Sequence, residues 1–242
     1  IVWTAADAPS DGAMLCNDTG VLDEGNPRLL LAGSGIKGAL RHRTVFHYRR
    51  LTGAVIDPNG KAPPTTIDAE PVVRILFGAA REKDGEGPAT AGLFSIDDVL
   101  FTTDDHDQTS LKITRNSIDR FTGGTIDHVL YDEQVLISKR NADKSFTLTL
   151  RWRPLRPEAV KSLRSRAGDE ATAKQTFKTM LNAFRCALDD LCAGRLPLGA
   201  GSGRGAGTCV GKHGFDSEQA FATLWPKAQA PDPAPDPAEA GS

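Results

Sequence analysis

The 242-residue sequence contains few cysteines and tyrosines and no long apolar runs. None of its 4 cysteines has the C-x-x-C spacing of zinc and redox motifs. No apolar run reaches the roughly 18 residues that a membrane-spanning helix requires. No basic segment followed by an apolar one marks a secretory signal. We therefore expect free thiols in a reducing compartment, which places the protein in the cytoplasm without membrane contact.

Histidine-based metal motifs are also absent. The 5 histidines are scattered, with no H-E-x-x-H or H-x-H pattern, so we expect no stable metal cage built by the protein. Loop aspartates such as Asp11 can still activate a hydroxyl group or hold Mg²⁺ together with a phosphate. A single loop aspartate is more commonly a cap or turn residue.

Positive charge is concentrated locally, although the formal net charge is −2. Residues 25–56 contain basic residues at 28, 37, 41, 43, 49 and 50 and no acid, and residues 195–214 contain Arg195, Arg204 and Lys212 and no acid. Either run alone is compatible with a solvated helix face. Because both occur among glycines, they favour binding of a polyanion.

The hydrophobic pattern predicts an α+β fold. We expect strands near 1–5, 29–32, 92–103, 133–138 and 146–152, and helices near 35–51, 72–77, 170–193 and 217–224. Residues 104–131 read as a long polar excursion, and the Pro/Ala/Asp-rich residues 229–242 as a disordered tail. The element order suggests an α+β sandwich of ferredoxin-like type over residues 1–228 with large loop insertions.

The first glycine motif is Gly33-Ser34-Gly35-Ile36-Lys37-Gly38, which matches G-x-G-x-x-G between a predicted strand and a predicted helix. With Asp57 in the position of a ribose-binding acid, Gly33, Gly35 and Gly38 allow a dinucleotide-binding enzyme as one interpretation. Two observations count against it. The regular strand and helix alternation of a doubly wound sheet does not follow, and the helix carries more basic residues than one pyrophosphate requires.

The second glycine motif is LPLGAGSGRGAGTC at residues 196–209, in which five glycines surround Arg204. Glycines let backbone N–H groups approach an anion closely, and arginine offers phosphate a forked donor. The motif is not a Walker A loop, because no G-K-[ST] follows. We therefore interpret it as a phosphate-contacting loop rather than a simple turn.

Together these segments resemble the RAMP superfamily. LAGSGIKGALR at residues 31–41 is similar to its P-G-S-S-L-K-G-A-L-R signature, and LPLGAGSGRGAGTC resembles its C-terminal glycine-rich loop. Between them, ITRNSIDRFTGGTIDHVLYDEQVL at residues 113–136 looks like the thumb segment of backbone subunits of type III CRISPR effector complexes. The three motifs occur in the family's order.

The resemblance implies a modified RRM-like core with a thumb at about residues 104–131. Such subunits stack with neighbouring RAMP subunits along a guide CRISPR RNA, and many cut complementary target RNA once per subunit. It implies guide contacts by residues of both glycine motifs, namely Ser34, Lys37, Arg41, Gly201, Ser202, Gly203, Arg204 and Gly205. It implies thumb contacts by Arg115, Arg120 and Phe121. By the same resemblance Asp11, with Asp7 as the alternative, is the cutting residue, and Mg²⁺ is supplied with the RNA.

Three alternatives remain open within this resemblance. The chain can be a non-cutting backbone or capping subunit, or a RAMP domain of a fused effector. It can also be a guide-processing ribonuclease, which would need a histidine near the glycine-rich loop, where only His213 is placed. Salt separates the RNA interpretation from the dinucleotide interpretation, since only RNA binding weakens steeply as salt rises.

Overall fold

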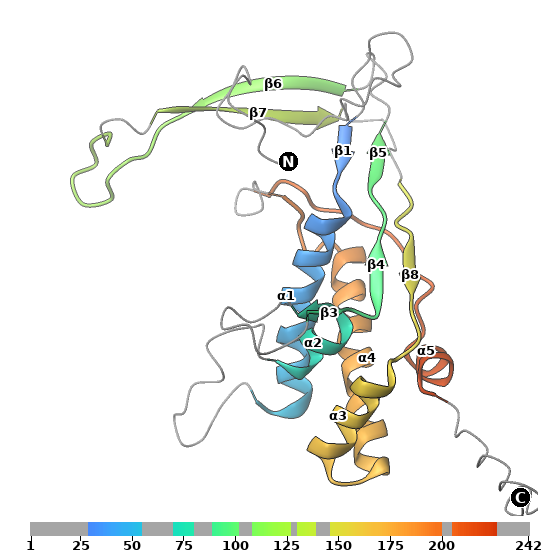
Figure 1. Ribbon diagram of the computed structural model, residues 1–242. Coiled ribbons are helices and arrows are strands. Elements are labelled where there is room, and N and C mark those ends of the chain that lie inside the picture. The colour runs from blue at the N-terminus through green and yellow to red at the C-terminus, as the bar shows by residue number, and fades with distance from the viewer. Residues whose placement is uncertain are drawn as a thin grey trace, which may run out of the picture. The chain divides into compact units, whose positions relative to one another are not determined.

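A computed structural model describes residues 29–54, 70–79, 89–101, 108–126, 130–138, 146–199 and 205–226 of the chain. The predicted α+β class is confirmed, because these residues form both helices and strands (Figure 1). The strands are β1 (Leu29–Leu31), β2 (Gly78–Ala79), β3 (Thr90–Ala91), β4 (Phe94–Ile96), β5 (Val99–Phe101), β6 (Gln108–Arg115), β7 (Tyr131–Ser138) and β8 (Leu150–Trp152). The helices are α1 (Gly33–Thr52), α2 (Pro71–Leu76), α3 (Pro157–Ala167), α4 (Glu170–Cys192) and α5 (Ser217–Leu224).

The described strands pair two by two, as β1-β5, β2-β3, β4-β8 and β6-β7. The described residues therefore do not form the continuous four-stranded sheet of an ideal ferredoxin-like sandwich. In the β1-β5 pair the strands are antiparallel and Leu30 lies opposite Leu100. The longest pair is also antiparallel and runs from Gln108 opposite Ser138 to Arg115 opposite Tyr131. Figure 1 shows β6 and β7 as a long two-stranded ribbon.

The chain divides into two compact units. The first unit takes its described residues from Ile1–Arg43, Ser95–Arg151 and Ala187–Lys212. It holds β1, the first half of α1, β5, the β6-β7 hairpin and the last turn of α4. Its buried apolar side chains lie on the two helices and at the start of the glycine-rich loop: Ile36, Leu40, Ala187, Leu188, Leu191 and Leu198.

The second unit takes its described residues from Thr44–Phe94, Trp152–Cys186 and His213–Ser242. Its core is aromatic, and Phe184 of α4 lies at its centre. The Phe184 ring centroid is 4.5 Å from that of Phe94 and 5.3 Å from that of Phe215, and Trp152 stacks on Phe215 at 5.1 Å. Aromatic pairs at these separations stabilise a core beyond the area that they bury.

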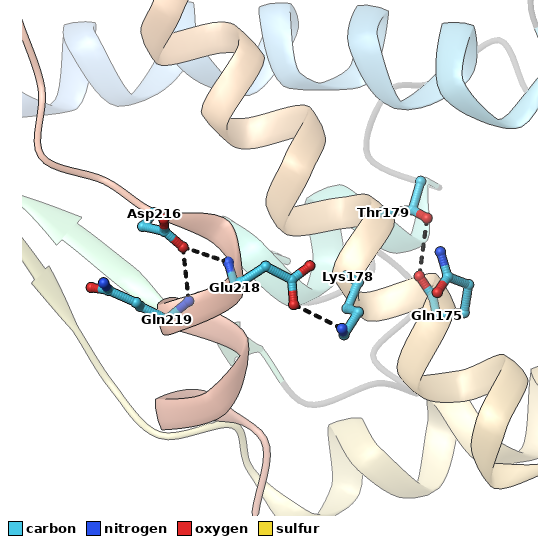
Figure 2. Close-up of polar contacts among 6 residues, drawn as sticks. All are labelled: Gln175, Lys178, Thr179, Asp216, Glu218 and Gln219. Atoms are coloured by element: carbon cyan, nitrogen blue, oxygen red, sulfur yellow. Dashed lines mark hydrogen bonds and ion pairs between the residues drawn. The ribbon is translucent and has the colours of Figure 1, made fainter.

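Side-chain caps fix the ends of the helices in this second unit. Asp169 accepts the Thr172 N–H at 2.8 Å in the first turn of α4. Asp216 accepts the Glu218 and Gln219 N–H groups at the start of α5 (Figure 2). Such caps satisfy donors that have no partner inside the helix, and each contributes about 1 kcal/mol. An ion pair of 2.8 Å between Lys178 and Glu218 joins α5 to α4 (Figure 2).

Most predicted elements are confirmed, and four local predictions are wrong. The helix expected from residue 35 begins two residues earlier, so that Gly33 lies in the first turn of α1. Residues 108–115, expected to be irregular, form β6. The strand expected over residues 92–103 is split into β4 and β5, and only residues 150–152 of the strand expected over 146–152 are extended in a sheet. The helix α3 was not predicted, although Pro157 at its start and the left-handed Gly168 at its end are typical of helix termini.

Three other predictions concern residues that lie outside the described ranges. These are the strand near residues 1–5, the aspartate-bearing loop that contains Asp7 and Asp11, and the disordered tail at residues 229–242.

Candidate nucleic-acid interface

The first glycine motif forms the N-terminal turns of α1. Gly33 is buried, and its N–H donates to an Asp98 carboxylate oxygen at 2.7 Å. A Cβ atom at Gly33 would lie 2.3 Å from the backbone oxygen of Ile96. Any side chain at this position would therefore collide with the backbone of β4, so the fold itself requires this glycine.

The other two glycines of the motif have no comparable requirement. Among the residues that the structure describes, nothing lies within 4 Å of a Cβ atom placed on Gly35 or Gly38. Glycine inside a helix costs about 1 kcal/mol relative to alanine, because its backbone loses more freedom on folding. Glycine at these two positions thus destabilises the helix, and no described residue gives a steric reason for it. Both positions leave the backbone of α1 open to close approach.

The predicted contact residues Ser34, Lys37 and Arg41 follow one another at steps of three and four residues. This spacing places them along one side of α1. Ser34 is exposed, whereas Lys37 and Arg41 are half-buried. The structure therefore brings this predicted set together as one basic track beside the open glycines.

A carboxylate ties α1 to the beginning of the second glycine motif. The Asp190 side chain at the end of α4 is only 6% exposed and accepts from Nε of Arg43 at 2.5 Å and from Nε of Arg195 at 2.7 Å. Each arginine uses a different carboxylate oxygen. Charge-assisted bonds of this kind are about twice as strong as neutral ones. Asp190 thus acts as a clamp between the α1 track and the chain that enters the glycine-rich loop.

The second glycine motif is closed at its base. The Leu198 N–H donates to the Gly207 carbonyl at 2.9 Å, and Ala193 and Val210 form an isolated antiparallel bridge. Gly207 has a φ of 76°, and a Cβ atom there would collide with the Leu198 carbonyl. Gly205 is exposed, with a φ of 79° and open space around it. The predicted contact residues Gly201, Ser202, Gly203 and Arg204 lie outside the described residues.

The segment that the resemblance assigns to a thumb ends in an ordered turn beyond the β6-β7 ladder. Asp119 accepts the Phe121 N–H at 3.0 Å and the Thr122 hydroxyl at 2.9 Å, and these bonds lower the pKa of the Asp119 carboxyl. The turn presents Phe121, which is 83% exposed, with the Arg120 guanidinium 4.8 Å from its ring centroid. Arg115, the third predicted thumb residue, is half-buried at the end of β6.

Exposed apolar side chains surround this turn. Ile118 is 62% exposed and Leu130 is 71% exposed, and Ile126 is exposed as well. An ordered apolar tip with an arginine beside an aromatic ring suits stacking against nucleic-acid bases, since arginine and aromatic planes both stack on them.

A polar cavity of about 460 Å³ in the second unit does not suit the same ligand. It is lined by Tyr48, Thr52, Ala171, Thr172, Gln175, Thr176 and Thr179. Three of its threonine hydroxyls donate to backbone carbonyls of their own helices, and burial followed by the nearby Glu70 charge raises the pKa of Tyr48. None of these described lining residues is cationic, so the cavity is a poor phosphate site.

The proposed cutting residues Asp11 and Asp7 lie outside the described ranges. Within those ranges, no group of three or more histidine, cysteine or acidic residues could hold a metal ion. Among the described helices, none combines the length and the apolar character needed to cross a bilayer.

Sequence reasoning missed three aspartates that organise the interface. Asp119 could have been found, because Asp followed by Thr and Gly three and four residues later is typical of side-chain-capped turns. The Asp98–Gly33 and Asp190–Arg43 contacts carry no local signal, since the paired residues lie 65 and 147 positions apart in the sequence; only Arg195, the other partner of Asp190, is near it in the chain.

The geometry does not fit the dinucleotide alternative. In a dinucleotide-binding fold the strand before the glycine motif belongs to a parallel sheet, and the third glycine lets the helix pack closely on it. Here β1 pairs antiparallel with β5, and no described residue would lie within 4 Å of a Cβ atom on Gly38.

Comparison with known protein families gives one match. The profile of the RAMP superfamily matches residues 17–210, which include both glycine motifs and the hairpin between them. The chain therefore belongs to the RAMP superfamily. Membership identifies it as a CRISPR-associated RNA-binding protein, with CRISPR RNA and other RAMP subunits as its partners. A comparison with curated proteins gives no match.

Proposed function

We propose that this chain is a backbone subunit of a type III-like CRISPR effector complex and that it binds guide RNA through sequence-independent phosphate contacts. The α1 track of Ser34, Lys37 and Arg41 contacts one stretch of the guide backbone, and the loop around Arg204 contacts another. Contacts to phosphates carry no sequence information, so any guide sequence is accepted and the choice of target is left to base pairing.

The open glycines of α1 are the observation that carries this proposal. Gly35 and Gly38 weaken the helix, and neither is packed tightly against any residue in the described part of the chain. Their small size becomes useful if a sugar-phosphate backbone lies directly on α1 between the basic side chains. A helix face meant only for solvent would gain stability from alanine at both positions.

The hairpin tip has a separate role in the proposal. In this proposal Phe121, with the Arg120 guanidinium beside its ring, stacks against a base at the edge of the guide–target duplex. Displacing a nucleotide there would turn the neighbouring 2′-hydroxyl toward the adjacent phosphorus.

The proposed cutting step follows from that geometry. Asp11, with Asp7 as the alternative, removes the proton from the 2′-hydroxyl, the 2′-oxygen attacks phosphorus in line, and the 5′-oxygen leaves and is protonated by water. Mg²⁺ arrives with the RNA in this proposal, and no step above depends on it.

Three glycine-to-alanine variants test the binding proposal. Gly35→Ala and Gly38→Ala should each raise the unfolding free energy by about 0.5–1 kcal/mol and yet weaken guide binding by about tenfold. Gly33→Ala is the matched control, because it should destabilise the fold through the Ile96 collision. Guide affinity is measured by filter binding across a salt series. Unchanged affinity in both Gly35→Ala and Gly38→Ala would contradict the proposal that guide phosphates lie on α1.

End-labelled complementary RNA given to the guide-loaded complex tests cutting. A ladder at regular intervals that disappears in Asp11→Ala, with target binding intact, supports the backbone nuclease. Loss in Asp7→Ala alone moves the role to Asp7. Tight guide-dependent binding without any cuts would make the chain a non-cutting backbone or capping subunit.

A further inference from the structure

Two of the cysteines lie on either side of the β-bridge that closes the glycine-rich loop. Ala193 and Val210 are bridge partners, and Cys192 and Cys209 are their chain neighbours. The Gly211 N–H donates to the Cys192 carbonyl at 2.9 Å, which confirms the antiparallel register at that end. Both cysteines are free thiols with intermediate burial.

Glycines occupy the positions opposite both cysteines. Gly211 pairs with Cys192, while a Cβ atom on Gly194 would lie 3.6 Å from the Cys209 carbonyl oxygen. Neither glycine has a side chain that could separate the two sulfur atoms. The proximity of Cys192 is also one cause of the raised pKa of the Cys209 thiol, after burial.

We propose that Cys192 and Cys209 form a reversible thiol–disulfide modification site that is closed by a peroxide. Diagonal neighbours across an antiparallel pair lie about 7–8 Å apart, and a disulfide joins Cα atoms about 4.4–6.8 Å apart. Closure therefore requires a shift of about 1–2 Å. Gly194, at a φ of 73°, and the exposed Gly211 are the residues that can absorb this shift.

One molecule of hydrogen peroxide is the oxidant that converts the two thiols into a disulfide. One thiolate attacks a peroxide oxygen, which gives a sulfenic acid and releases water. The second thiolate then attacks the sulfenyl sulfur, so the S–S bond forms and a second water leaves. Two thiols and one hydrogen peroxide yield one disulfide and two waters, and a dithiol reductant reverses the change.

Closure would fix the base of the glycine-rich loop. The loop is at present held there by backbone bonds, namely the Ala193–Val210 bridge and the Leu198–Gly207 bond. A covalent link between Cys192 and Cys209 encloses the Leu198–Gly207 bond and lies directly beside the Ala193–Val210 bridge. The modification does not depend on the RNA-binding role, so the two ideas can fail separately.

The test uses the full chain in a Cys16→Ser, Cys186→Ser background, which leaves only the proposed pair. Hydrogen peroxide at mildly alkaline pH should remove both free thiols with the loss of two hydrogen atoms per molecule. Trypsin should then release residues 186–195 joined to residues 205–212, and dithiothreitol should separate them. In that background Cys192→Ser is the control, and it should give a stable sulfenic acid or a disulfide between two chains.

Hydrogen exchange supplies a second readout that does not depend on identifying the joined tryptic peptides. Oxidation should slow exchange at the Gly211 amide by about tenfold or more, because opening of the bridge is restrained. The wild-type chain should give the same joined peptides despite its other two cysteines. Separate sulfenic acids on Cys192 and Cys209, or pairing of Cys209 with Cys16 in the wild type, would overturn the proposal.

Discussion

Replacing Asp190 with asparagine should loosen the connection between α1 and the entry to the glycine-rich loop. The variant keeps the size of the side chain and one acceptor oxygen, but it removes the charge that both arginines share. It also places an amide N–H₂ group, which is a donor, against a guanidinium donor. One of the two short bonds, 2.5 Å to Arg43 or 2.7 Å to Arg195, is therefore lost.

The magnitude follows from the exposure of the three side chains. Removing one partner of a fully buried ion pair costs about 3–5 kcal/mol. Here only Asp190 is buried, at 6% exposure, whereas the Arg43 side chain is 29% exposed and that of Arg195 is 59% exposed. Water therefore rehydrates much of the unpaired charge, and loss of an acid from the C-terminal end of α4 returns about 0.5 kcal/mol. We expect a net loss of about 2 kcal/mol, or a fall of roughly 4–8 °C in Tm.

The two arginines are matched controls for each other because they bind the same carboxylate. Urea unfolding of Arg43→Gln and Arg195→Gln should show the larger loss for Arg43→Gln, whose pair is better shielded from solvent. A double-mutant cycle between Asp190→Asn and Arg43→Gln should give a coupling energy of about 1 kcal/mol or more. Guide affinity should fall in Asp190→Asn without a change in the salt slope, because Asp190 positions the interface and contributes no phosphate contact.

Two results would refute this reasoning. The first is a loss below about 0.5 kcal/mol in Asp190→Asn, which would mean that solvent screens the clamp as it screens a surface pair. The second is an equal loss in the two arginine variants, which would mean that exposure does not set their contributions.

Three further predictions concern neighbouring features. Asp98→Asn keeps an acceptor for the Gly33 N–H but removes a negative charge from the start of α1, so guide affinity should rise in binding assays; a clear fall would contradict the proposed track. Acidification should loosen the hairpin turn. The hydrogen bonds that lower the pKa of Asp119 stabilise the turn fully at pH values above the ordinary carboxyl pKa, and this stabilisation is lost as the pH falls through the lowered pKa. The Phe121 amide resonance followed by NMR should report that change, which Asp119→Asn should abolish. Gly207→Ala should destabilise the chain strongly in thermal unfolding and Gly205→Ala only moderately, because only the former collides with the Leu198 carbonyl.

Four of the five described helices, all except α3, could be predicted because their signals are local. In α4, Phe177, Leu181 and Phe184 recur at steps of four and three residues, and all three are buried in the structure. The strand β6 could not be predicted in this way. Its sequence begins with Gln, Thr and Ser, its apolar alternation is limited to Leu111 and Ile113, and its ladder depends on pairing with residues 131–138.

The part of the candidate site that consists of glycines and basic residues could be predicted from the sequence. The sequence motifs located the α1 track, and the structure places Ser34, Lys37 and Arg41 on one side of that helix. The motifs could not show that Gly33 is required by packing while Gly35 and Gly38 are not, because this distinction depends on where β4 ends. Nor could they pair Asp190 with Arg43, which is 147 residues away.

The ladder between β6 and β7 restricts how the length of this hairpin can change. Neighbouring residues of a strand point to opposite faces, and each adds about 3.3 Å. Removing one residue from each strand would turn the tip that carries Phe121 onto the opposite face, whereas removing two from each would keep its orientation and shorten its reach by about 7 Å. Reach and orientation are thus coupled, and functional variants of the hairpin should differ in length by even numbers of residue pairs.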